Sequence, residues 1–248
     1  MEIILRHNKM AYTADLSQPI DISIPLQNGT QNPNCYYADP VEFSTIRSGD
    51  FVGSVAEGGT VNYQSVKLTP HGNGTHTECY GHISPGHVTL NECLKSFHFI
   101  AQLISVTPER RGGDQVVLLK DIEPQLADGV EALIIRTLPN ESTKLKRQYS
   151  GTNPPYLEGE IGNFLKEKGV KHLLVDLPSV DREVDQGVLA VHRSFWDITG
   201  DIRRDATITE LIYINNLISD GIYLLNLQIT SLEMDASPSK PVLFNLKS

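Results

Sequence analysis

The sequence predicts one α/β domain that spans residues 1–248. Strand-like segments outnumber helical ones, and the clearest helix is followed directly by a short apolar run, as expected for a helix packed on a sheet. Proline and glycine are spread along the chain rather than pooled in a linker, which favours one domain over two. A chain of 248 residues can bury a large core without disulfides or metal ions.

The strands are predicted from segments rich in β-branched and aromatic residues between turn-forming residues. One of them, 172–177, is a continuous apolar run typical of a strand buried on both faces. In chain order the predicted strands are residues 2–5, 20–24, 41–45, 61–68, 97–106, 132–136, 172–177, 223–229 and 242–246.

Residues 157–168 form the clearest predicted helix, because apolar residues recur there at helical spacing and Gly169 can cap its end. A shorter helix is expected to begin near Thr89, whose hydroxyl can act as its N-cap. Residues 206–214 are interpreted as a strand, since β-branched residues alternate along them. Glu210 then lies among isoleucines, where its carboxylate needs a cationic side chain or a metal as a partner.

The charge balance and the cysteine content exclude several classes of function. The chain has 21 basic and 30 acidic residues, a net charge of −9, whereas a nucleic-acid surface needs clustered Lys and Arg. The short basic run 144–147 is interpreted as a solvent-exposed face. No segment approaches the roughly 18 apolar residues of a membrane helix, and charged residues near the N-terminus argue against a secretion signal. Three widely spaced cysteines predict no disulfide framework and a cytoplasmic setting.

Histidines are concentrated in the segment His71-Gly-Asn-Gly-Thr-His76-Thr-Glu78-Cys-Tyr-Gly-His82. Its glycines disfavour a helix, so we expect a loop at the end of a strand. His76 and Glu78 are two residues apart and project to the same side of an extended backbone, where they could hold one ion. Imidazole and carboxylate ligands suit zinc or manganese. His82 is the candidate for proton transfer beside the ion.

Two simpler interpretations of this segment remain open. Loop histidines often only form hydrogen bonds or face solvent. A purely structural zinc site is the second alternative, although structural zinc favours thiolates and Cys79 alternates away from Glu78 in an extended chain.

The segment from Gly74 to Glu78, followed by His82, resembles the signature His-x-Gly-Thr-His-x-Asp-x-Pro-x-His of the metal-dependent cyclase family, which includes bacterial kynurenine formamidases and isatin hydrolases. The stretch 176–181, Asp-Leu-Pro-Ser-Val-Asp, is similar to the family's Asp-x-x-Ser-x-Asp. The stretch that begins at Glu210 is similar to its Glu-x-Leu-x-Asn-Leu. The resemblance extends from about residue 15 to the C-terminus.

The resemblance implies a swivelling β/β/α fold, with a mixed β-sheet core flanked by helices, in a homodimer or homotetramer. It implies a site with one or two divalent ions, zinc or manganese, and a small-molecule amide as the substrate. The implied reaction is hydrolysis of an amide C–N bond, of the arylformamidase or cyclic-amide type, in which a metal-bound hydroxide attacks the carbonyl. The implied metal ligands are His76, Glu78, His192 and Glu210, with His82 as the proton shuttle.

Three positions depart from the family signature. The first histidine of the pattern falls at Gly72, so His71 reaches the metal only if the loop accommodates a one-residue insertion. Glu78 stands for aspartate, and Tyr80 stands for proline. These departures leave open a non-catalytic small-molecule-binding protein of the same fold, or a structural metal in an oligomer. His192 could instead form ordinary hydrogen bonds near a strand end, and Glu210 could pair with Arg203 or Arg204.

Overall fold

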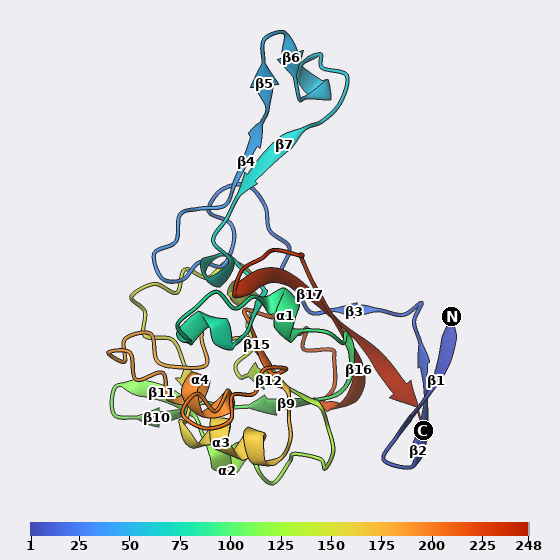
Figure 1. Cartoon of the computed structure of the whole chain (residues 1–248), viewed down its shortest axis with the longest axis vertical. Coiled ribbons are helices and arrows are strands. Elements are labelled where there is room, and N and C mark those ends of the chain that lie inside the picture. The colour runs from blue at the N-terminus through green and yellow to red at the C-terminus, as the bar shows by residue number, and fades with distance from the viewer. Residues whose placement is uncertain (248) are drawn as a thin grey trace.

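The computed structural model describes residues 1–247, and its main element is a 10-stranded sheet. The last strand, β17 (Ala236–Lys247), pairs along its middle with β16 (Gly221–Ile229). Its first residues pair with β8 (His76–Glu78), which also pairs with β15 (Thr207–Glu210). These pairings join the two ends of the central sheet, so that the sheet closes into a barrel-like ring (Figure 1).

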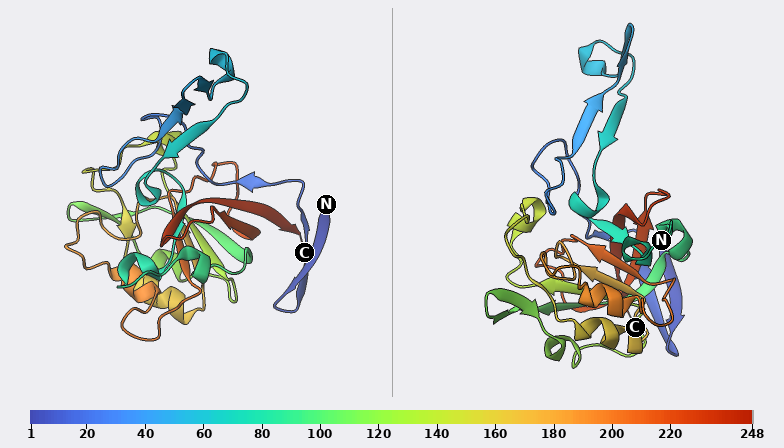
Figure 2. Two further views of the ribbon diagram at one scale, coloured as in Figure 1. Left: turned by 45° about the horizontal axis from the view of Figure 1, so that its top comes forward. Right: turned by 60° about the vertical axis from the view of Figure 1, so that its left-hand side comes forward.

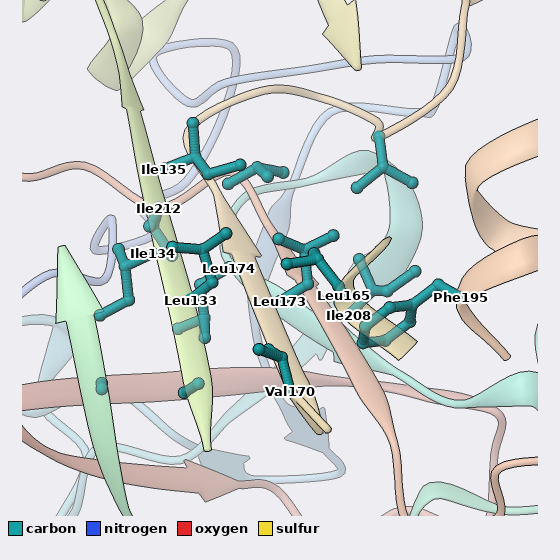
Figure 3. Close-up of a cluster of buried hydrophobic side chains, with 14 of the residues drawn as sticks. Leu133, Ile134, Ile135, Leu165, Val170, Leu173, Leu174, Phe195, Ile208 and Ile212 are labelled. Carbon is teal, nitrogen blue, oxygen red and sulfur yellow. The ribbon is translucent and has the colours of Figure 1, made fainter. Parts of the chain in front are cut away.

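Parallel strands form the most deeply buried part of this ring. β9 (His98–Val106), β12 (Ala132–Thr137) and β14 (His172–Val175) lie side by side and are followed by β15, all in the same direction. Every residue of β12 and β14 is buried, as expected for parallel strands that are covered on both faces. Figure 3 shows the apolar side chains that fill this region: Leu133, Ile134, Ile135, Leu165, Val170, Leu173, Leu174, Phe195, Ile208 and Ile212.

Helices are short and few in the described chain. The longest, α3 (Glu160–Glu167), packs against α4 (Ala190–Phe195). None of the helices among residues 1–247 combines the length and the apolar composition that a membrane crossing requires. The remaining helical and strand elements are α1 (Leu90–Cys93), α2 (Leu119–Ile122), the 3₁₀ turns η1 (Val55–Glu57), η2 (Pro70–Gly72), η3 (Tyr80–Ile83) and η4 (Ser142–Lys146), and the strands β1 (Glu2–His7), β2 (Met10–Asp15), β3 (Ile20–Asp21), β10 (Glu109–Arg111), β11 (Asp114–Val117) and β13 (Tyr156–Leu157).

A β-ribbon, residues 42–67, projects from the body of the molecule, and we call it the arm (Figures 1 and 2). In the arm β4 (Glu42–Thr45) pairs with β7 (Gln64–Lys67), and β5 (Arg47–Ser48) pairs with β6 (Phe51–Val52) at the tip. Five of its large apolar side chains are exposed, and a two-stranded ribbon is only marginally stable by itself in water. These exposed residues are Phe51, Val55, Val61, Tyr63 and Val66.

Several predicted elements have different bounds in the structure. The helix predicted over 157–168 begins at Glu160, because Leu157 is instead drawn into β13, where it pairs with Val117 of β11. The strand predicted over 206–214 ends at Glu210, because Leu211 has a φ of 55° and cannot continue an extended strand. The loop predicted around the histidines contains a true strand, since β8 fills the gap between β15 and β17.

The prediction that the basic run 144–147 is a solvent-exposed face is wrong for its first residue. Lys144 is buried, and its Nζ lies 2.7 Å from Oδ2 of the buried Asp176. Thr137 stabilises the same carboxylate through its backbone N–H and its hydroxyl. A lysine can be buried here because its charge is paired and hydrogen-bonded.

Buried His172 should make the protein sensitive to acid. Burial lowers the pKa of His172 to about 3, against about 6.5 in an unfolded chain. The folded state therefore binds fewer protons, so the contribution to stability is complete above pH 6.5 and falls as the pH drops toward 3. We expect the free energy of unfolding to decrease by about 1 kcal/mol per pH unit below 6.5 through this residue. Denaturant titrations at pH 7, 6 and 5 should show a shallower decrease for His172→Gln, whereas exposed His98→Gln should match the wild type. Equal slopes for all three proteins would contradict the prediction.

Candidate metal centre

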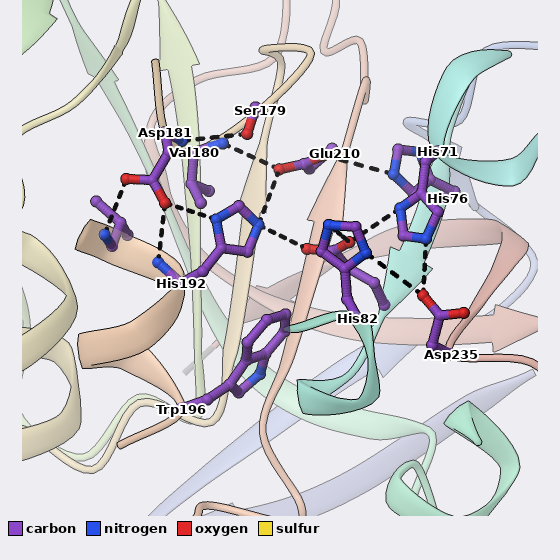
Figure 4. Close-up of polar contacts among 12 residues, drawn as sticks. His71, His76, His82, Ser179, Val180, Asp181, His192, Trp196, Glu210 and Asp235 are labelled. Atoms are coloured by element: carbon purple, nitrogen blue, oxygen red, sulfur yellow. Dashed lines mark hydrogen bonds and ion pairs between the residues drawn. The ribbon is translucent and has the colours of Figure 1, made fainter. Parts of the chain in front are cut away.

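Pairing of β8 with β15 brings three of the predicted site residues together. His76 lies opposite Glu210 in the antiparallel register (Figure 4). Glu78 lies on the same face of β8, two residues further on. Thr77 projects from the other face, where its hydroxyl lies 2.8 Å from that of Thr209. Because side chains alternate along β8, one imidazole and one carboxylate face the site. The threonine between them faces the other way and forms a hydrogen bond with β15.

His192 joins this group from α4, so the alternative interpretation that placed it near a strand end is wrong. The Asp181 carboxylate accepts hydrogen bonds from the backbone N–H groups of Val191 and His192, at 2.9 and 3.1 Å. It also lies 2.6 Å from Nδ1 of His192, which directs Nε2 toward Glu78 Oε1 at 3.0 Å. Asp181 had no predicted role. A role for Asp181 could have been predicted from its position: it ends the stretch 176–181, which resembles the family pattern, and it comes shortly before His192.

His71 reaches the cluster despite its one-residue offset. Its Nδ1 lies 3.1 Å from Glu78 Oε2, and its Nε2 lies 2.8 Å from Asp235 Oδ2. Gly72, at the position of the pattern's first histidine, packs so closely that an added Cβ would lie 2.3 Å from Cβ of Ala38. Position 72 thus has no room for a side chain, and the 3₁₀ turn η2 presents the preceding residue to the site.

His82 lies at the more accessible side of the cluster. Its side chain is 33% exposed, whereas that of Glu78 is 1% exposed. The two ring nitrogens lie 3.5 Å from Asp235 Oδ2 and 3.9 Å from Glu78 Oε2, and the ring stacks on His71 at 4.2 Å between centroids. Asp235 was missed as a site residue, because only the pairing of β17 with β8 brings it beside the histidines.

The alternative partners of Glu210 are not used. Arg203 donates to backbone carbonyls, and Arg204 donates to the Tyr80 hydroxyl. Glu210 Oε1 accepts the N–H of Val180 at 2.9 Å, and Oε2 lies 3.4 Å from Nε2 of His76. The Glu210 carboxylate therefore faces the histidine cluster.

The electrostatics of the cluster favour bound positive charge. Burial opposes protonation of His192 and His71, but other effects raise both pKa values to about 10. For His192 these are hydrogen bonds with Asp181 and Glu78, and for His71 a hydrogen bond with Asp235 together with the nearby negative charge of Glu78. Burial likewise acts to raise the pKa of Glu78, yet the neighbouring histidines hold it well below its usual range. Buried carboxylates of this kind need a compensating cation, which can be a proton on histidine or a metal ion.

Two buried atoms fit a metal ion better than protons. Nδ1 of His76 lies 2.9 Å from the Gly74 carbonyl, which can only accept a hydrogen bond, so Nδ1 carries the proton and Nε2 carries the lone pair. This Nε2 and Oε2 of Glu78 are both buried without a hydrogen-bond partner among residues 1–247. A divalent cation would satisfy both atoms. Three overlapping groups have suitably placed ligand atoms: His71, His76 and Glu78; His71, His82 and Asp235; and Glu78, His82 and His192.

The fold and the cluster define a closed-sheet α/β protein with a candidate divalent-metal centre of nitrogen and oxygen ligands. Its sequence matches the family model described as putative cyclase over residues 14–182. The chain therefore belongs to this family, as the resemblance implied.

Curated relatives extend this similarity over nearly the whole chain. The kynurenine formamidase of Bacillus cereus (strain ATCC 14579) is 29% identical over 229 residues, which cover 92% of this chain and 97% of the relative. The kynurenine formamidase of Bacillus cytotoxicus is 28% identical over 231 residues, with the same coverage of both chains.

Solved structures share the fold. A potential metal-dependent hydrolase with cyclase activity matches with a TM-score of 0.68 at 15% identity, over 93% of this chain and 99% of the other. Isatin hydrolase A from Labrenzia aggregata, bound to benzyl benzoate, also has a TM-score of 0.68, at 12% identity over 92% and 93% of the two chains. The predicted α/β fold with a mixed sheet is thereby confirmed.

Proposed function

We propose that this protein is a metal-dependent hydrolase that cleaves an amide C–N bond in a small molecule, of the arylformamidase or cyclic-amide type. The observation that carries the proposal is the pair of buried, unpartnered atoms, Nε2 of His76 and Oε2 of Glu78, within one histidine–carboxylate cluster. Similarity to kynurenine formamidases supports the choice of an amide as the bond that is cleaved.

In this proposal His76, Glu78, His192, Glu210 and His71 hold one or two divalent ions, zinc or manganese. Such an ion supplies Lewis acidity, which polarises a carbonyl and lowers the pKa of water. The surrounding residues orient the ligands: Asp181 fixes the ring of His192, and the Gly74 carbonyl fixes that of His76. Asp235 fixes the ring of His71.

His82 is the proposed general base and general acid. It takes the proton from the attacking water and returns it to the amine that leaves, so that the ring ends the cycle in its starting state. Its greater exposure and its longer distances to the carboxylates suit a group that moves protons rather than one that binds the ion. Asp235, 3.5 Å from Nδ1, is proposed to position the ring.

Elemental analysis and an amide-hydrolysis screen test the proposed function directly. We expect one or two zinc or manganese ions per wild-type chain and turnover of N-formylkynurenine, isatin or simple aryl formamides. Both should be lost in His76→Ala, because the variant removes a ligand, and both should be retained in His87→Ala, which changes an exposed histidine. A wild-type protein that binds neither ion after reloading would contradict the proposal. Metal binding without turnover would favour a non-catalytic binding protein.

We propose that the arm packs on a second copy of this chain in a homodimer or homotetramer. Its support is the row of exposed apolar side chains on a ribbon that has no other layer of this chain on it. Sedimentation equilibrium should show an oligomer that shifts toward monomer in the double variant Tyr63→Asp and Val66→Asp. The matched change Ile4→Asp, at a 76% exposed position on β1, should have no effect. A monomeric wild type would contradict the proposal.

We propose further that residues 1–248 act as one domain in the cytoplasm. The support for this setting is that Cys35, Cys79 and Cys93 are all free and buried, which suits a reducing compartment.

A further inference from the structure

A cavity of about 360 Å³ lies at the N-terminal ends of the parallel strands, and the metal centre lies at the other end of β15. Its lining includes His98 and His172, at the starts of β9 and β14, and Arg204 and Asp205, just before β15. The metal centre uses Glu210 at the end of β15. Because β15 has four residues, the two sites are separated by about 10 Å of strand. The cavity is large enough for a small organic ligand.

The carboxylates in the cavity wall are already engaged. Glu92 Oε2 accepts the N–H of Thr89 at 3.0 Å, and Glu131 Oε2 accepts that of Ile100 at 3.0 Å. Asp205 forms an ion pair with Lys171. Each acidic group of the lining therefore has a fixed donor within the protein.

Two cations of the same wall have no such partner. Across residues 1–247, neither Lys95 nor Arg204 forms an ion pair with a carboxylate, although both line the cavity of a protein with a net charge of −9. The only side chain that receives a hydrogen bond from Arg204 in the described chain is Tyr80, at 3.2 Å. A guanidinium and an ammonium that face one cavity form a receptor for a carboxylate, because the planar guanidinium binds both of its oxygens.

The remaining wall favours a flat ligand with a single charge. Phe99 and His172 make this part of the wall aromatic, with ring centroids 3.9 Å apart and ring planes tilted by 41°. Burial lowers the pKa of His172 to about 3, so this ring is neutral and adds no charge to the wall. The three engaged carboxylates would repel a dianion more strongly than a monoanion.

We infer that this cavity is a second binding site, which takes a small planar organic monocarboxylate and holds it between Arg204 and Lys95. Binding of this carboxylate would also affect the metal centre. Arg204 contacts Tyr80, the first residue of η3, and η3 carries His82. Capture of the guanidinium by a carboxylate would compete with its contact to the Tyr80 hydroxyl.

Calorimetric titration of the metal-loaded protein with benzoate tests this site, with benzamide as the neutral analogue of the same shape. We expect benzoate to bind at least about tenfold more tightly than benzamide, and Arg204→Gln and Lys95→Gln each to weaken it by about tenfold or more. Arg110→Gln, an exposed cation on β10, is the matched control and should bind like the wild type. Fluorescence of Trp196, the single tryptophan, gives a second readout, because its Nε1 donates to the Ala206 carbonyl two residues from Arg204.

Benzoate could also bind the metal ion, so His76→Ala separates the two sites. Binding that persists in His76→Ala and is lost in Arg204→Gln supports the cavity. Binding that is lost in His76→Ala and persists in Arg204→Gln would place the carboxylate at the metal centre and overturn the inference. Equal affinity for benzoate and benzamide, or no binding of benzoate, would overturn it as well.

Discussion

Replacing His82 by alanine should leave the metal content of the protein unchanged and lower kcat for amide hydrolysis by about 10²–10⁴-fold. His82 is the most exposed histidine of the cluster, and its nitrogens lie 3.5 and 3.9 Å from the nearest carboxylates. His192, by contrast, is buried, with both nitrogens within 3.0 Å of a carboxylate oxygen. Loss of His82 thus removes a proton carrier from the edge of the cluster and leaves the proposed ligands in place.

The pH–rate profile separates this role from a structural one. If His82 is the general base, the limb of the kcat profile that reports its deprotonation should disappear in His82→Ala, while KM changes little. His87→Ala, a change at an exposed histidine five residues after His82, should retain both limbs. Elemental analysis of both variants completes the test. A His82→Ala protein that has lost its metal would show that His82 is a ligand, and unchanged turnover would show that it has no role in the reaction.

Local sequence patterns could predict His76, Glu78 and His82 as candidate site residues, because their residue types and their spacing indicate their chemistry. The two-residue spacing of His76 and Glu78 is enough to put them on one face of an extended strand. The spacing could not show that His71 also reaches Glu78. That outcome depends on Ala38, which leaves no space for a side chain at position 72 and lies far away in the sequence.

What the sequence could not predict are the groups whose partners are distant along the chain. Asp235 reaches His71 only because β17 returns to pair with β8. Lys144 is buried only because Asp176 lies within reach of it, although a lysine in a polar segment is normally exposed. The closure of the sheet also depends on segments that are distant along the chain. β8 has only three residues, and it is stabilised as a strand by β15 on one side and β17 on the other.

The largest loss of metal affinity is expected for Glu78→Gln. Glu78 lies at the centre of the cluster, with its carboxylate oxygens 3.1 Å from Nδ1 of His71 and 3.0 Å from Nε2 of His192. Glutamine keeps the volume of the side chain and removes its charge. Loss of one member of a buried set of charges costs about 3–5 kcal/mol, which corresponds to a decrease in affinity of about 10²–10⁴-fold.

A competition titration against a chelator measures this change, and Trp196 supplies the signal because its ring lies 5.4 Å from that of His192. Glu167→Gln, at an exposed position on α3, is the matched control and should bind metal like the wild type. Glu78→Asp should lie between these two variants: it keeps the charge, but its carboxylate is one methylene further from His71 and His192. If Glu78→Gln binds the ion as tightly as the wild type, Glu78 is not a ligand. The affinity would then have to come from the groups around Asp235, where His71 and His82 share a second carboxylate.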